Sequence, residues 1–219
     1  MNRLALLTLA LFVLPSVALA TGDSNDETER LNRADMALAK RTAVHKSDLT
    51  PGWRLVRSGP SRESGDDPCP SFEPDLSAFV LTGKHETSFA HSSTGAQIVS
   101  GVSVFRNVRD AAGDFRASAI QAFLRCLRSA VLQGLREADV RARITSSRMS
   151  TTPRVGAQSV SYRVVAMSYP TKSVPRFKVY TNVIWFRRGR SQATLLFMAP
   201  FAPVRGQAGL AGMVARRMR

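Results

Sequence analysis

The sequence predicts an α+β fold: a single, mostly antiparallel sheet of about six to seven strands, packed on one face by a long helix, with terminal helices. Short segments of the last third alternate apolar and polar residues, the period of half-buried antiparallel strands. One central segment repeats its apolar residues every three to four positions, as an amphipathic helix does. The predicted strands connect locally along the chain, which favours an antiparallel over a parallel arrangement.

The first twenty residues are predicted to be a secretory signal peptide. Arg3 supplies a positive charge, Leu4–Val13 is almost wholly apolar, and Ala18-Leu19-Ala20 has the pattern of a cleavage site. The alternative is an uncleaved anchor, although a bilayer-spanning helix needs about 20 apolar residues and this run is interrupted by polar ones. We therefore expect a secreted or periplasmic protein, with residues 21–219 forming one domain.

The elements of the N-terminal half follow from local composition. Residues 21–29 are polar and acidic and are expected to be flexible. Pro51-Gly52 predicts a turn before a strand that starts at Trp53. The remaining elements expected here are a helix over 27–42, a long polar loop over 58–77, and two strands over 78–91 and 96–106.

A long helix is expected to follow, from an N-cap at Asn107 to about residue 135. Its apolar stripe includes Phe115, Phe123 and Cys126. The last third then predicts four strands, a hairpin turn at Gly189 and a closing helix over 206–218.

Cys69 and Cys126 are the two cysteines of the chain. An even pair in an exported protein is usually bridged, and the bridge would anchor the polar loop that contains Cys69. Two cysteines so far apart do not form a zinc knuckle. A disulfide between them is therefore expected.

The charges are unevenly distributed along the chain. The net charge is +15, from 31 basic and 16 acidic residues, and residues 140–219 contain 15 bases and no acid. Arginine suits phosphate and carboxylate partners because its planar group binds them bidentately. An exported protein meets anionic lipids, wall polymers or acidic proteins, so no nucleic acid partner is expected. A merely solvated basic surface is the alternative.

Four basic residues of the predicted sheet are candidates for binding an anionic partner: Arg141, Arg143, Arg163 and Lys178. Each alternates with apolar neighbours, so adjacent strands in register would align them on the face away from the core. Like charges so placed repel one another, which suggests that anionic groups lie beside them. These anionic groups belong either to an external ligand or to the acidic residues in the N-terminal half of the same molecule.

The sequence contains no recognisable catalytic constellation. A nucleophile elbow, a phosphate-binding loop and a dinucleotide fingerprint are all absent. His85 and His91 are six residues apart on one strand, about 20 Å, too far to share a metal. No catalytic residue, metal site or cofactor is expected.

Several short segments carry a resemblance. They are Leu49-Thr50-Pro51-Gly52-Trp53, Cys69 in its loop, Val102–Phe105, Phe123-Leu124-Arg125-Cys126-Leu127, and Trp185-Phe186-Arg187-Arg188-Gly189-Arg190. In their order they resemble the exported lipoproteins and PknH-type extracellular sensor domains of actinobacteria, and more loosely the PsbP-type sheet fold. The resemblance implies a non-enzymatic binding or sensing domain and transfers no binding residue.

The leading hypothesis is thus an exported, non-catalytic binding or sensor-type domain with an unknown small molecule or anionic envelope component as partner. The alternative is an envelope-associated protein that uses its basic C-terminal half to hold anionic surfaces. A hydrolase whose residues are assembled from distant segments is the third.

Overall fold

The computed structural model describes residues 26–59, 72, 74–150, 155–170 and 175–218. The predicted signal peptide lies outside the described residues. The strands are β1 (Thr28–Glu29), β2 (Trp53–Gly59), β3 (Val80–His91), β4 (Gln97–Phe105), β5 (Ala142–Ser150), β6 (Gln158–Ser168), β7 (Lys178–Arg188) and β8 (Ser191–Pro200). The helices are α1 (Arg33–Thr42), the short η1 (Lys46–Asp48), α2 (Val108–Ser118), α3 (Gln121–Glu137) and α4 (Gln207–Arg217).

The strands form one open sheet of eight, which confirms the α+β fold with a mostly antiparallel sheet. The order is β1-β3-β4-β8-β7-β6-β5, and β2 also pairs with β3. Only β1 and β3 pair in parallel among the described strands; the other pairs are antiparallel. β5 therefore forms one edge of the sheet.

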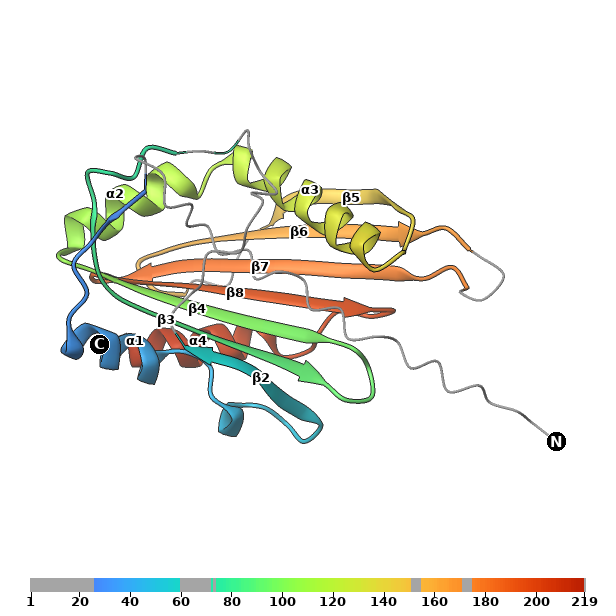
Figure 1. Ribbon diagram of the computed structural model, residues 1–219, viewed down its shortest axis with the longest axis horizontal. Coiled ribbons are helices and arrows are strands. Elements are labelled where there is room, and N and C mark those ends of the chain that lie inside the picture. The colour runs from blue at the N-terminus through green and yellow to red at the C-terminus, as the bar shows by residue number, and fades with distance from the viewer. Residues whose placement is uncertain (1–25, 60–71, 73, 151–154, 171–174, 219) are drawn as a thin grey trace.

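Helices cover both faces of the sheet (Figure 1). α2 and α3 lie on one face, where Phe123, Tyr162 and Trp185 belong to one core cluster. The terminal helices α1 and α4 lie on the other, over a second cluster that contains Ile184 and Phe197. The physical reason is visible in β7, where neighbouring residues are buried alternately against the two clusters.

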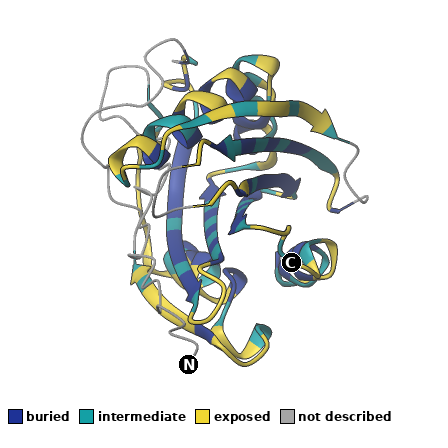
Figure 2. Ribbon diagram, turned by 90° about the vertical axis from the view of Figure 1, so that its right-hand side faces the viewer, coloured by how far each residue is buried: buried dark blue, intermediate teal, exposed yellow. Residues whose placement is uncertain are grey.

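Coverage is uneven across the sheet (Figure 2). The central strands are buried on both sides, whereas residues of β5 are exposed or half-buried. α4 packs against β7 and β8, and α1 against β3 and β4. On the α4 face, β5 and β6 therefore extend beyond the described helices.

The predicted long helix is two helices. α2 ends at Ser118 and α3 begins after Ile120, although Asn107 caps α2 as expected by accepting a hydrogen bond from the Asp110 amide at 2.8 Å. α2 packs against β4, β7 and β8, and α3 against β5 and β6. Because the sheet twists, the break allows successive helices to follow it where one straight helix would diverge.

The first helix is shorter than predicted. Its N-cap is Asn32, whose side chain accepts from the Asp35 amide at 3.0 Å. The preceding residues Thr28 and Glu29 instead pair with β3 as β1. The polar residues before Asn32 thus extend the sheet rather than the helix.

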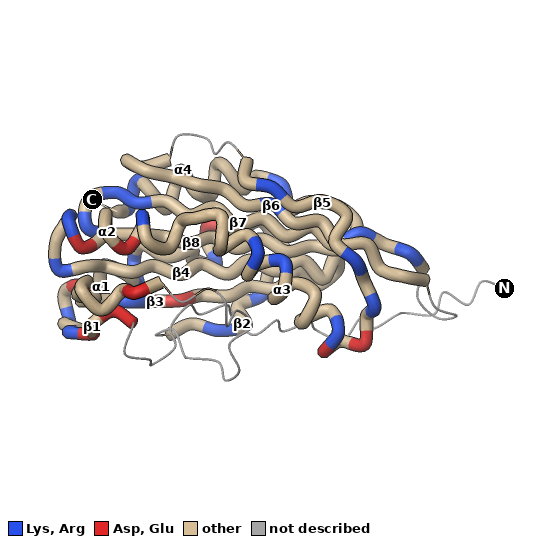
Figure 3. Tube along the Cα trace, turned by 90° about the horizontal axis from the view of Figure 1, so that it is seen from above, with Lys and Arg blue, Asp and Glu red and all other residues tan. Residues whose placement is uncertain are grey.

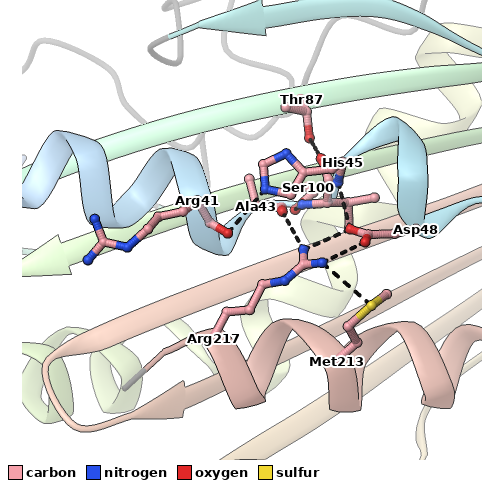
Figure 4. Close-up of polar contacts among 9 residues, drawn as sticks. Arg41, Ala43, His45, Asp48, Thr87, Ser100, Met213 and Arg217 are labelled. Carbon is pink, nitrogen blue, oxygen red and sulfur yellow. Dashed lines mark hydrogen bonds and ion pairs between the residues drawn. The ribbon is translucent and has the colours of Figure 1, made fainter.

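The C-terminal helix is tied to the segment after α1 by one arginine (Figure 4). Arg217 donates two hydrogen bonds to the carboxylate of Asp48, with N–O distances of 2.7 and 2.5 Å, and a third to the carbonyl of Ala43 at 3.2 Å. Burial raises the pKa of Asp48, but the hydrogen bonds from Arg217 and from the His45 amide, together with the charges of these two residues, leave the pKa below its usual value. These contacts hold the two terminal helices on the same face of the sheet.

Candidate functional site

Three of the four predicted basic residues share one face of neighbouring strands. Arg143 of β5 pairs in register with Met167 of β6, and Met167 pairs with Lys178 of β7. Arg163 of β6 lies on the same face, four residues from Met167. The alternate β5 residue, Ile144, packs against the α3 cluster. The basic side chains are therefore on the face opposite α3, as the alternation predicted.

Arg141, the fourth residue of the predicted set, lies outside β5. It lies one residue before β5, is exposed, and its carbonyl accepts a hydrogen bond from the Tyr169 amide at 2.9 Å. It does not line the pocket described below.

A β-bulge adds a basic residue that the sequence analysis missed. The pairing of β5 with β6 shifts between Ile144 and Ser146, so that Thr145 is an extra residue. Without this shift, Arg148 would fall on the α3 face, because successive residues alternate between faces. With it, Arg148 pairs directly with Arg163. The regular alternation of 140–145 gave no signal of the shift.

These two arginines line a pocket of about 200 Å³ on the open part of the sheet. β5, β6, β7 and the start of α4 with its preceding loop all contribute to it. The lining residues are Ser146, Arg148, Arg163, Val165, Tyr180, Thr181, Asn182, Pro203 and Gln207. Residues far apart in the sequence thus meet in one hollow.

Amide side chains fix one wall of the pocket. Asn182, 8% exposed, pairs in register with Arg163, and its amide nitrogen donates to the Gln207 side-chain oxygen. The Gln207 amide nitrogen donates to the carbonyl of Val204 at 2.9 Å. Each amide nitrogen carries a second hydrogen. No side chain caps the N-terminus of α4, which starts after Gly206 in the left-handed conformation.

The acids of the N-terminal half pair with arginines other than the predicted set. Asp35 binds Arg190, and Asp48 binds Arg217. Among the described residues, no ion pair involves Arg141, Arg143, Arg148, Arg163 or Lys178. Acidic segments gather around α1, β1 and β3 and at the end of α3 (Figure 3). The intramolecular alternative therefore accounts for Arg190 and Arg217, and not for the pocket arginines.

Only one of the two cysteines in the predicted disulfide belongs to the described residues. Cys126 is 2% exposed on the inner side of α3, and Cys69 lies outside them. Phe72, three residues after Cys69, packs its ring against Phe123 at a centroid distance of 5.8 Å. Phe72 thus contacts α3 one turn before Cys126, which favours the disulfide, and the pairing stays a prediction.

A serine and a histidine do meet, as the hydrolase alternative requires. The Ser58 hydroxyl lies 3.2 Å from Nε2 of His85. Burial lowers the pKa of His85, and the charges of Lys40 and His45 lower it further. No carboxylate of the described residues hydrogen-bonds this imidazole, so the group that orients the base in a catalytic triad is not found there.

A buried acid pair lies between α2 and the sheet. Asp114, 3% exposed, accepts a hydrogen bond from Gln192 at 2.5 Å and shares another with Glu27. Burial, together with the charge of Glu27, raises the pKa of Asp114 to about 8, and burial also raises the pKa of Glu27. The Gln192 side-chain oxygen accepts from the Trp185 indole at 2.9 Å. These partners make the pair part of the packing of α2.

Groups of three or more histidine, cysteine, aspartate or glutamate side chains that could hold a metal do not occur in the described part of the chain. The described helices also include none with the length and apolar content needed to cross a membrane.

Comparison with known proteins shows a shared fold. No protein-family model and no curated protein matches the sequence. Among solved structures, the chain is similar to the extracellular domain of PknH from Mycobacterium tuberculosis, with a TM-score of 0.53 and 10% sequence identity. The match covers 84% of this chain and 95% of that one. The chain therefore has the fold of an extracellular domain of this type.

Proposed function

We propose that this protein is an extracytoplasmic, non-catalytic binding domain of the sensor type. Two observations support the compartment: the signal-peptide pattern of residues 1–20, and the fold shared with the extracellular domain of PknH. Fold alone does not assign a ligand, so the binding function depends on the chemistry of a site.

The observation that carries the proposal is the pocket on the open part of the sheet. Its lining combines apolar walls, including Val165 and Tyr180, with a few polar groups, which is the usual composition of a ligand site. Its polar residues come from β5, β6, β7 and α4, so a bound ligand would contact all four elements.

Native mass spectrometry on protein secreted by the native host tests this proposal. We expect a chain that begins at Thr21 and carries a small molecule. Ser146→Phe, which fills the pocket from the exposed edge strand, should release the molecule. Ser129→Phe on the exposed side of α3 is the matched control and should retain it. A chain that starts at Met1, or a ligand that survives Ser146→Phe, would contradict the proposal.

Contact with an anionic envelope surface is the second candidate, and one residue favours it. Phe201 is 65% exposed and has a φ of 69°, a conformation that aromatic residues rarely adopt. Its amide donates to the carbonyl of Lys178 at 2.7 Å, so an exposed ring and a cation lie together. Such a combination suits a lipid interface, where the ring enters and the cation stays at the head groups.

Sedimentation with phosphatidylglycerol vesicles separates the two candidates. A surface-binding protein would sediment at low salt, and Phe201→Ser and Lys178→Gln would each release it. Binding would also fade with added salt, because exposed charges are screened over about 10 Å at 0.1 M. A binding domain with its ligand in the pocket would lose that ligand on Ser146→Phe. Phe201→Ser and Lys178→Gln would leave its ligand binding unchanged.

A further inference from the structure

We infer that the pocket binds a phosphate monoester, held between Arg148 and Arg163. This inference rests on the proposed function, because it names the chemical class of ligand for the same site. The argument starts from the pairing of β5 with β6, in which the two arginines are direct cross-strand partners. Directly opposite side chains have Cβ atoms about 4.5–5.5 Å apart, and like charges at that separation destabilise a sheet.

Arg148 is exposed and Arg163 is half-buried, and both differ from Arg190 and Arg217 in their partners. Arg190 and Arg217 each bind a carboxylate with two hydrogen bonds. Neither Arg148 nor Arg163 pairs with an acid of the described residues, although both face a pocket. Two guanidinium groups around one hollow suit a doubly charged oxyanion, because each can bind it through two parallel N–H groups.

Further donors surround the same hollow. The second amide hydrogens of Asn182 and Gln207 are not used in the hydrogen bonds described above. The N-terminus of α4 starts at Gln207 and lacks a capping side chain, so its backbone N–H groups add positive potential. The pair of arginines, the two side-chain amides and the N-terminus of α4 all favour the binding of an anion with several acceptor oxygens.

The size of the pocket limits what else the ligand contains. Its volume of about 200 Å³ is below the roughly 300–1,000 Å³ of sites for drug-sized ligands. A phosphate group with a small organic substituent is compatible with that volume. Tyr180 and Pro203 are the lining residues that would contact the substituent.

The test measures binding to the mature chain by calorimetry, with inorganic phosphate, glycerol 3-phosphate, and phosphatidylcholine vesicles with and without phosphatidic acid. Binding of the soluble species supports a soluble ligand, and binding only to phosphatidic acid vesicles supports a lipid head group. Arg148→Gln and Arg163→Gln should each weaken binding about tenfold or more, the usual effect of losing a charged hydrogen bond. Arg141→Gln and Arg128→Gln remove the same charge outside the pocket and should leave affinity unchanged.

A thermal-unfolding measurement without ligand separates a binding role from a structural one. Because the paired arginines repel each other, Arg148→Gln and Arg163→Gln should raise the Tm of the free protein. A lower Tm in both variants would mean that the arginines stabilise the fold, and the inference would be wrong. Absence of binding to every phosphate species, or equal weakening by Arg141→Gln and Arg128→Gln, would also overturn it.

The inference and the proposed function can fail separately. If secreted protein carries a molecule that Ser146→Phe releases, yet no phosphate species binds, the pocket is a ligand site of different chemistry and only the inference falls. If neither a carried molecule nor phosphate binding is found, both fall.

Discussion

Asp35 of α1 and Arg190 of the β7–β8 turn form a bidentate ion pair although 155 residues separate them in the sequence. The N–O distances are 2.7 and 2.5 Å, and Arg190 also donates to the carbonyl of Phe105 at 3.1 Å. The carboxylate is buried and the arginine is partly exposed. The pair therefore fixes the start of α1 to the hairpin at the far end of the chain.

Arg190→Gln should lower the free energy of unfolding by about 2 kcal/mol, because it leaves a buried carboxylate without its charged partner. Hydrogen bonds from Arg190 hold the pKa of Asp35 well below its usual 3.8. The stabilisation is therefore present above that value and lost as the pH falls below it. Urea unfolding at neutral and acidic pH measures both effects. Arg176→Gln, at an exposed position, is the control, and equal loss in the control would refute the role of the pair.

Asp114 should give the opposite pH dependence. Its pKa is raised from 3.8 to about 8 in the fold, so folding favours the protonated form. This group's contribution to stability is complete below 3.8 and declines as the pH rises toward 8. Asp114→Asn removes the titration of this group, leaving only that of Glu27, and should make the protein more stable than wild type at pH 8. Thermal unfolding across this range tests the prediction, and Asp139→Asn at an exposed position should leave the wild-type slope unchanged.

Oxidised protein should contain the Cys69–Cys126 disulfide. Its intact mass should be two hydrogens below that of the reduced chain, and a peptide containing both cysteines should appear in a non-reducing digest. Reduction should lower the free energy of unfolding by roughly 4 kcal/mol in the chain-entropy model for a loop of this length. Two alkylatable thiols in freshly secreted protein would show the prediction to be wrong.

Gly83 should not tolerate a side chain. A Cβ at this position of β3 would overlap the backbone carbonyl of Asp35, so α1 can approach the strand closely only at a glycine. Gly83→Ala should lower the free energy of unfolding by about 1–3 kcal/mol, the usual effect of overpacking. Gly101→Ala in β4 is the control, because a Cβ there meets no atom within 4 Å. Chemical denaturation measures the free energy of unfolding of both variants, and an equal loss in the two would contradict the steric argument.

The sequence predicted most elements because their patterns are local. The strands of the last third follow from alternation, the hairpin from Gly189 with its φ of 58°, and the start of α2 from the cap at Asn107. The helix break at Ala119 and Ile120 was missed, because the apolar stripe runs through it without a glycine or proline. α2 packs against β4, β7 and β8, and α3 against β5 and β6, a tertiary arrangement that no local pattern reports.

The candidate site was predicted in part. Alternation placed Arg143, Arg163 and Lys178 on one face, and the register confirms that placement. Arg148 was missed because a bulge of one residue reverses the face on which the rest of β5 lies. The contribution of Gln207 depends on where α4 crosses the sheet, a tertiary relationship that spacing in the sequence does not encode.

Because β5 is an edge strand of the sheet, its arginines have a second role besides binding an anion. An outermost strand offers unpaired backbone groups to another copy of the chain, and natural proteins discourage such self-association with bulges and charges. β5 has both: the irregularity at Thr145, and the cations Arg143 and Arg148. An anion that neutralised Arg148 would weaken this protection, so occupancy of the hollow and the tendency to dimerise through β5 would rise together.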